Sequence, residues 1–214
     1  MDANIERKKF NVILLGEKSV GKTCLVQSLT GKEFNENQIA TIGVDFVSRN
    51  ATIDGKNFVF RIYDTGGQER YDSVATSILK TMNGFILVFS VDNEQSLEKI
   101  SKWIENIEEN VDRKEKVLIL VGNKIDINRR EVTNEEGMNF AKERNMKYFE
   151  TSAKTGFGIN EAFNQIFQDI YKLDKEIKEN QQKENVNQND NQRNERIEIN
   201  KKNHNKKLNK SKCC

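Results

Sequence analysis

Hydrophobic residues follow two alternating patterns along the chain: short apolar runs and longer segments with a helical period. Phe10–Leu15, Phe85–Phe89 and Val117–Val121 are nearly continuous apolar runs. Runs of this length with polar borders are typical of strands buried on both faces, as in a parallel sheet. Residues 94–110 lie between the last two runs and carry one apolar helical face, formed by Leu97, Ile100, Ile104 and Ile107.

Local signals complete the expected order of elements. Asp54-Gly55 separates Gly43–Ile53 from Lys56–Tyr63 and predicts a β-hairpin, because both turn residues tolerate positive φ. Thr133 and Glu136 form a capping-box pattern that opens a helix ending near Arg144. A closing helix is predicted over residues 159–173 from the apolar face of Ile159, Ala162, Phe163, Ile166, Phe167 and Ile170. The fold class is therefore α/β: a mostly parallel sheet with one antiparallel hairpin strand and helices on both faces.

The folded pattern stops near Leu173. Of the 42 residues in 173–214, 8 are apolar and 14 are Asn or Gln. Such a segment buries too little apolar surface to offset the entropy of ordering the chain. We expect an N-terminal extension at residues 1–7, one domain at 8–172 and a disordered tail at 173–214, with a weak helical extension to about Glu184.

Charge divides at the same point. The chain has 35 basic and 33 acidic residues, a net charge of +2, but the tail carries +4 and the rest −2. An acidic body argues against a nucleic-acid-binding domain, and a basic tail suits an anionic surface. The sequence shows no secretory h-region, no apolar run of 18 residues and too few cysteines for a disulfide framework, so we expect a cytosolic chain that contacts membranes through its end.

A phosphate-binding loop is the most specific motif. Gly16–Thr23 matches G-x-x-x-x-G-K-T, follows a predicted strand and opens a predicted helix. Backbone N–H groups of such a loop surround phosphate oxygens, and the helix N-terminus favours negative charge. Lys22 is expected at the β- and γ-phosphates, and the Thr23 hydroxyl at Mg²⁺.

Three further segments indicate which nucleotide the loop binds. Asn123–Asp126 follows a buried strand, and the Asp126 carboxylate can accept the two N–H donors of a guanine edge. Thr151–Lys154 follows the short strand Tyr148–Glu150 and can present a backbone N–H to the base oxygen. Asp64–Gln68 ends the second hairpin strand, with the Asp64 carboxylate available for a metal. An ATP-using P-loop kinase is the alternative, and Asn123–Asp126 disfavours it.

Together these motifs resemble the Ras superfamily of small GTPases, whose G domain is a P-loop NTPase fold, over about residues 8–172. Within the superfamily the chain most resembles the Rab family. Thr41–Phe46 is similar to the Rab switch I signature, Gln68–Arg70 continues switch II as in Rabs, and Cys213-Cys214 resembles a double-prenylation end.

The resemblance implies a role for each matching residue. Gln68 would orient the attacking water as the catalytic residue. The phosphates would contact Gly16, Ser19, Val20, Gly21, Lys22, Thr23, Cys24, Thr41 and Gly67. The guanine would contact Phe34, Asn123, Lys124, Asp126, Ser152, Ala153 and Lys154. The metal would be held by Thr23, Thr41 and Asp64. Effectors would contact Ile42, Gly43, Val44, Asp45, Phe46, Tyr63 and Ile78. Lipids would be attached to Cys213 and Cys214.

The resemblance also implies the cofactor and the cellular setting. Mg²⁺ would be the cofactor, GTP the substrate and GDP the product of an intrinsically slow hydrolysis. Partners would be an exchange factor, a GTPase-activating protein, a GDP dissociation inhibitor, the prenylation machinery and effectors, with no nucleic acid and a monomeric G domain. The protein would regulate vesicle traffic from the cytoplasmic face of an intracellular membrane, with a cytosolic pool.

Some positions depart from the Rab pattern. Lys18 stands in the phosphate loop where the family places a small residue, and Gly66 stands where Rabs have alanine. A long cation at position 18 is expected to crowd an activating protein's arginine finger, unless it points into solvent and changes little. Lys18 and Gly66 leave a slow or GTP-locked binding module as one alternative. A Ras-like signalling GTPase is the other, because Phe89–Asp92 resembles Ras as much as Rab.

Overall fold

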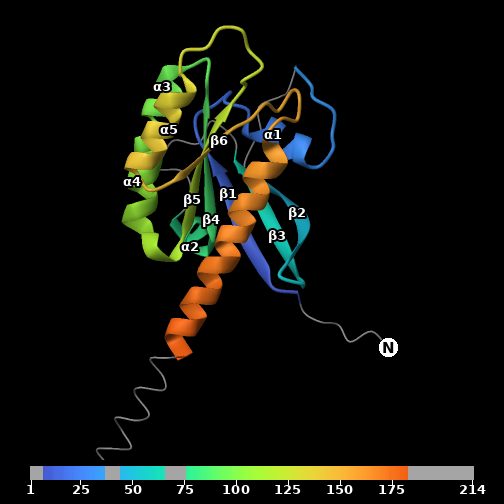
Figure 1. Cartoon of the computed structure of the whole chain (residues 1–214), viewed down its shortest axis with the longest axis vertical. Helices are drawn as coiled ribbons and strands as arrows, with labels where there is room; N and C mark the ends of the chain where they lie inside the picture. The colour runs from blue at the N-terminus through green and yellow to red at the C-terminus, as the bar shows by residue number, and fades with distance from the viewer. Residues whose placement is uncertain (1–6, 37–43, 66–75, 183–214) are drawn as a thin grey trace, which may run out of the picture. The chain divides into compact units, whose positions relative to one another are not determined.

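A single mixed sheet forms the centre of the fold in the computed structural model, which describes residues 7–36, 44–65 and 76–182. Within these ranges the strands are β1 (Lys9–Leu15), β2 (Val44–Ile53), β3 (Lys56–Thr65), β4 (Gly84–Ser90), β5 (Val117–Asn123) and β6 (Lys147–Glu150). Their order is β2-β3-β1-β4-β5-β6 (Figure 1). Only the β2–β3 pair is antiparallel among the described strands, which confirms the predicted α/β class.

The hairpin turn lies where the sequence predicts it. Asp54 and Gly55 connect β2 to β3 with φ values of 51° and 72°. Two consecutive positive φ values are the geometry of the tight turns that match strand twist. The register pairs Phe46 with Tyr63 and Ser48 with Arg61.

The helices are α1 (Lys22–Leu29), α2 (Thr76–Thr81), α3 (Glu94–Glu98), α4 (Ile100–Asn110) and α5 (Asn134–Glu143), with a 3₁₀ turn η1 (Arg113–Glu115) and a further helix over 159–182. The capping box of Thr133 and Glu136 is present at the start of α5. The predicted single helix over 94–110 is wrong in one detail, because it is interrupted at Lys99. There the N–H of Lys102 donates to the Lys99 carbonyl at 3.2 Å, a tighter turn than an α-helix makes.

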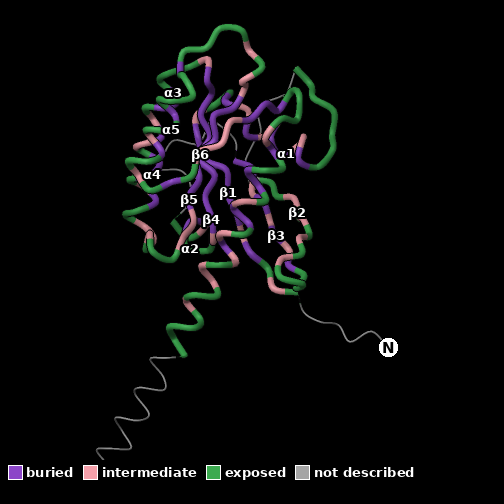
Figure 2. The backbone as a smooth tube through the Cα atoms, viewed as in Figure 1, coloured by how far each residue is buried: buried purple, intermediate pink, exposed green. Residues whose placement is uncertain are grey.

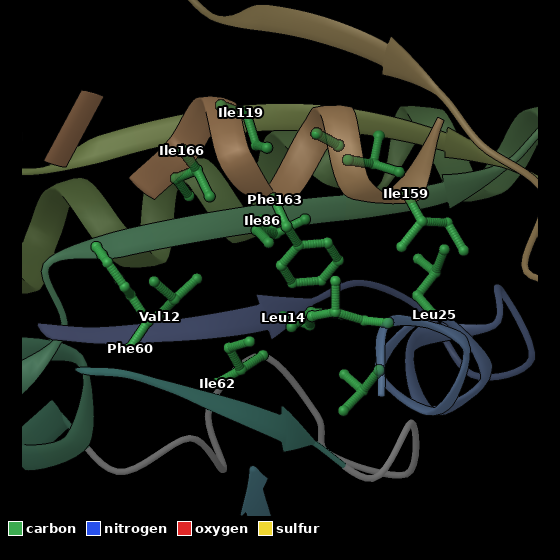
Figure 3. Close-up of a cluster of buried hydrophobic side chains, with 14 of the residues drawn as sticks. Val12, Leu14, Leu25, Phe60, Ile62, Ile86, Ile119, Ile159, Phe163 and Ile166 are labelled. Carbon is green, nitrogen blue, oxygen red and sulfur yellow. The ribbon is translucent and has the colours of Figure 1, made fainter. Parts of the chain in front are cut away.

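Apolar side chains form one cluster on each face of the sheet. On one face, residues of β1, β3, β4 and β5 pack against α1 and the helix that begins at 159 (Figure 3). The other cluster joins the opposite side chains of these strands to α2, α3, α4 and α5. Val12 and Leu14 face the first cluster, and Ile13 and Leu15 face the second. β1, β4 and β5 are consequently buried on both sides (Figure 2), which explains their continuous apolar runs.

The chain divides into two units after Leu173, close to the domain boundary expected at 172. Residues 174–182 of the second unit are helical, so the first part of the tail forms the predicted helical extension and is not disordered. An i,i+4 ion pair between Lys178 and Asp174, at 3.0 Å, supports it. Among the described helices, none is both long and apolar enough to cross a membrane.

Candidate nucleotide-binding site

The carboxyl ends of the parallel strands meet at one edge of the sheet, and four of these strands end at or lead into a segment that the sequence singled out. β1 leads into the phosphate loop, β3 ends beside Asp64, β5 ends at Asn123, and β6 leads into Thr151–Lys154. Open α/β sheets bind ligands at this edge. The fold therefore gathers motifs that lie more than 100 positions apart in the sequence.

Two glycines fix the course of the phosphate loop. Gly16 has φ +148°, and a Cβ on it would lie 2.1 Å from the Val88 carbonyl oxygen. Gly21, at the start of α1, has φ +96°, and its Cβ would lie 2.4 Å from Asn123 Nδ2. Any side chain at either position would push the loop away from β4 or from the base-binding segment, so glycine is required at both.

Lys22 is a cation held against the loop that it follows. Its side chain is buried, and Nζ donates to the carbonyl oxygens of Gly16 at 2.8 Å and Glu17 at 3.0 Å. Val20 is buried and anchors the loop to the core, whereas Ser19 is exposed with φ 63°. A buried ammonium at a helix N-terminus is the arrangement that binds phosphate oxygens.

Two of the predicted metal-binding residues, Thr23 and Asp64, belong to the described segments. Asp64 is buried at the end of β3, and its charge reaches the start of α1, where burial and then Asp64 raise the pKa of the Cys24 thiol. Thr23 immediately precedes Cys24 on α1. The described residues contain no group of three His, Cys, Asp or Glu side chains that could cage a metal. A hydroxyl and a carboxylate with water and phosphate ligands fit Mg²⁺, which is rarely bound by an all-protein cage.

Asn123 joins the phosphate loop to the base-binding segments. It is 1% exposed, and its Nδ2 donates to the Val20 carbonyl oxygen at 2.9 Å. Its Oδ1 accepts from Thr151 Oγ1 and from the Ala153 N–H, both at 3.2 Å. A backbone N–H of the base-binding segment Thr151–Lys154 thus donates to Asn123, and this one buried amide links two separate segments, the phosphate loop and residues 151–153.

Asp126 and Lys124 are also held in place. Ser152 Oγ donates to Asp126 Oδ1 at 2.6 Å, which orients the predicted guanine-binding carboxylate. Lys124 has φ 70°, and its Nζ lies 3.4 Å from Asp92 Oδ2. The sequence analysis missed Asp92; its position just beyond the end of β4, at the same edge of the sheet, is the signal that would have found it.

A second group that the sequence analysis missed, Arg130, Tyr148 and Glu150, stabilises the loop between β5 and α5. Glu150 accepts hydrogen bonds from Arg130 and from Tyr148 Oη, the latter at 3.0 Å. Burial opposes ionisation of Glu150, but hydrogen bonds from Arg130, Asn134 and Tyr148 outweigh it and hold the pKa of its carboxyl below the usual value. Burial, with the Glu150 charge, raises the pKa of Tyr148. This network lies directly before Thr151–Lys154.

The remaining guanine-binding candidates, Phe34 and Lys154, are far apart in the sequence. Phe34, in the segment after α1, is 39% exposed. Lys154 Nζ lies 6.0 Å from the centroid of its ring. An aromatic side chain and a lysine from the base loop are therefore neighbours.

Two of the predicted effector-binding residues form an aromatic pair on the hairpin. Phe46 is 51% exposed, and its ring centroid lies 5.5 Å from that of the half-buried Tyr63. Asp45 is exposed, Ile78 on α2 is half-buried, and Val44 begins β2. The other predicted site residues lie outside the described residues: Thr41, Ile42, Gly43, Gly67, Gln68, Cys213 and Cys214.

Lys18 is an exposed residue of the phosphate loop. With Ser19, Gln95 and others it lines a cavity of about 400 Å³ between the loop and the start of α3. The neighbouring Glu17 forms an ion pair with Lys99 at 2.9 Å, at the interruption between α3 and α4.

Comparison with known proteins identifies the family of this chain. A model of the Ras family matches residues 11–172. Rab-8 of Diplobatis ommata is 40% identical over 179 residues, 83% of this chain and 85% of the relative. Rab-13 of Mesocricetus auratus is 39% identical over 162 residues (75% and 79%), and Rab-8A of Bos taurus 39% over 173 residues (80% and 83%). Since the family match spans most of the chain, this protein belongs to the Ras family and is a Rab-like small GTPase.

Proposed function

We propose that this protein is a Rab-like switch that cycles between GTP and GDP and regulates vesicle traffic through GTP-dependent effector binding. The observation that carries the proposal is the hydrogen bonding of Asn123 to both the phosphate loop and the base loop. A nucleotide bound at this edge contacts both loops at once, so its base and its phosphates are read together.

The chain's own residues supply positioning and charge for hydrolysis. Lys22 and the loop N–H groups hold the phosphates, and Thr23, Thr41 and Asp64 would hold Mg²⁺. The bound ion supplies charge neutralisation at the β- and γ-phosphates. Gln68 orients the attacking water, and Thr41 and the Gly67 N–H contact the γ-phosphate. Loss of that phosphate releases both contacts, which makes the segments around 41 and 67 the switch.

The decisive experiment identifies the nucleotide that copurifies with the full chain and measures its turnover. We expect GDP or GTP, a preference for guanine over adenine nucleotides, and slow phosphate release that Gln68→Ala slows further. Copurification of ADP or ATP would overturn the assignment. Equal rates for wild type and Gln68→Ala would remove the role of Gln68 and leave nucleotide binding intact.

The exposed Phe46–Tyr63 pair is the proposed effector surface. Arg61 lies on the same face of the hairpin, with its guanidinium carbon 5.8 Å from the Phe46 ring centroid. No carboxylate among the described residues forms an ion pair with Arg61. An apolar partner residue flanked by an acid suits this surface. Phe46→Ala should abolish GTP-dependent effector binding while hydrolysis persists; loss of both would point to misfolding.

Membrane attachment is proposed to follow from Cys213 and Cys214. Two lipid chains, or one chain with the six lysines of Lys201–Lys212, give stable anchoring where one chain alone does not. Prenylated wild type should sediment with anionic vesicles, and the variant with both cysteines changed to serine should stay in the supernatant. The same distribution for both would refute lipid anchoring.

A slow or GTP-locked module is the second candidate, favoured by the exposure of Lys18 in the phosphate loop. We expect Lys18→Ser to hydrolyse GTP faster than wild type in single turnover with an activating protein, because serine would no longer crowd the arginine finger. That finger increases the hydrolysis rate about 10³–10⁵-fold. Equal rates would show that Lys18 points into solvent and changes nothing.

A further inference from the structure

The segment that follows α1 is attached to the domain at its start. Residues 30–36 are exposed and carry Phe34. Just before them, Arg49 of β2 donates to the Leu29 carbonyl oxygen at 2.8 Å and to Asn160 Oδ1 at 3.1 Å. The beginning of the segment is thus fixed by a half-buried guanidinium on the neighbouring strand.

A second attachment lies at its far end, on the base-binding side. Glu36 Oε1 is 2.9 Å from Lys154 Nζ, a contact between residues 118 positions apart. Lys154 belongs to the loop that presents the Ala153 N–H, and its ammonium also lies over the Phe34 ring. The ammonium is therefore held between a carboxylate and an aromatic ring of one segment.

We infer that Glu36 is a positioning residue of the nucleotide site, whose carboxylate holds Lys154 beside Phe34 and so slows release of the bound nucleotide. The inference rests on the proposed function, since it requires guanine between Phe34 and the base loop. A leaving base has to separate these two segments, and separation breaks the ion pair. Glu36 contacts Lys154 rather than the reacting atoms, so it acts through Lys154.

The expected effect is small and depends on salt. Both side chains are partly exposed, at 53% for Lys154 and 72% for Glu36. Exposed ion pairs contribute little and are screened as ionic strength rises. Loss of the pair should therefore speed GDP release about two- to five-fold at low salt.

Glu33 provides the matched control. It is an exposed glutamate in the same segment, and it forms no ion pair with any described residue. Glu33→Gln removes the same charge three residues away. A general effect of negative charge near the site would appear in both variants, whereas an effect of the contact appears only in Glu36→Gln.

The test is the dissociation rate of tritiated GDP from the full chain with excess unlabelled GDP, at 25 mM and 500 mM NaCl. We expect Glu36→Gln to release GDP faster at 25 mM, to approach wild type at 500 mM, and to be rescued in part by Glu36→Asp. Glu33→Gln should match wild type throughout. Equal rates for Glu36→Gln and wild type, an acceleration unchanged by salt, or the same acceleration in Glu33→Gln would each overturn the inference. A wild-type chain that retains no GDP would overturn the proposed function as well.

Discussion

Replacing Asn123 with alanine tests whether one buried amide holds the two halves of the site together. The change removes a donor to the Val20 carbonyl and an acceptor for the Ala153 N–H. Each buried polar group left without a partner costs about 1–3 kcal/mol. We therefore expect the free energy of unfolding to fall by about 2–6 kcal/mol, a large share of the roughly 5–15 kcal/mol that stabilises a typical domain.

Urea unfolding at several GDP concentrations separates this structural cost from the loss of ligand. A bound nucleotide stabilises the folded state by an amount that rises with the logarithm of its concentration above Kd. Asn123→Ala should lower the midpoint at every concentration and also weaken the rise with GDP, because both loops that contact the nucleotide lose their link.

Asn83 is the control for this experiment. Its side chain accepts one hydrogen bond, from the Asn11 N–H at 2.9 Å, beside the amino end of β4 and away from the site. Asn83→Ala should cost about 1 kcal/mol and leave the dependence on GDP parallel to wild type. If Asn123→Ala stays within about 0.5 kcal/mol of wild type and keeps the full GDP dependence, the amide does not connect the loops.

The remaining predictions concern two glycines with positive φ, the aromatic core and the Glu150 network. Gly16→Ala should destabilise the fold by more than about 3 kcal/mol in urea unfolding, because the added methyl group would clash with β4. Gly31→Ala should cost only about 1–2 kcal/mol in the same assay, because Gly31 has φ +76° but open space around it. Phe167→Ala, which removes a ring stacked 3.9 Å from one on β3, should lower thermal stability by about 3–5 kcal/mol, and the exposed Phe157→Ala by less than about 0.5 kcal/mol. Because folding lowers the pKa of Glu150, its ionised carboxyl stabilises the folded state above the ordinary glutamate pKa near 4.5, and this stabilisation is lost as pH falls through the pKa of the folded state. Unfolding measured across acid pH should show this loss in wild type and lack it in Glu150→Gln.

The local elements could be predicted because each depends on neighbours in sequence. The hairpin at Asp54-Gly55 and the capping box at Thr133 follow from backbone preferences within a few residues. The phosphate loop likewise carries its strand, glycines and helix in one continuous stretch. Such signals survive in a single sequence, whatever the rest of the chain does.

Contacts between distant polar residues could not be predicted in the same way. The apolar pattern shows which face of an element is buried, but not which surface charges meet across loops. The Arg130–Glu150 and Glu36–Lys154 pairs join segments 20 and 118 positions apart. The interruption at Lys99 was also missed, because the apolar period of residues 94–110 continues through it.

The structure also explains why Tyr148 lies next to the base loop. A Cβ on Gly122 of β5 would lie 2.6 Å from the Tyr148 hydroxyl, and one on Gly137 of α5 would lie 2.5 Å from its ring. Two glycines on separate elements therefore make the space for this ring, and its hydroxyl reaches Glu150, one residue before Thr151.

The three attachments of the base-binding region differ in how far they are buried, and we expect this difference to order the steps of nucleotide release. Asn123 is buried with three hydrogen bonds, Glu150 is partly buried within its network, and the Glu36–Lys154 pair is exposed. Exposed contacts open at the lowest free energy, so the segment carrying Phe34 should separate first while the link between the base and phosphate loops persists. An exchange factor that opens this side would need to break only a screened ion pair, whereas one that acted through Asn123 would have to expose buried polar groups.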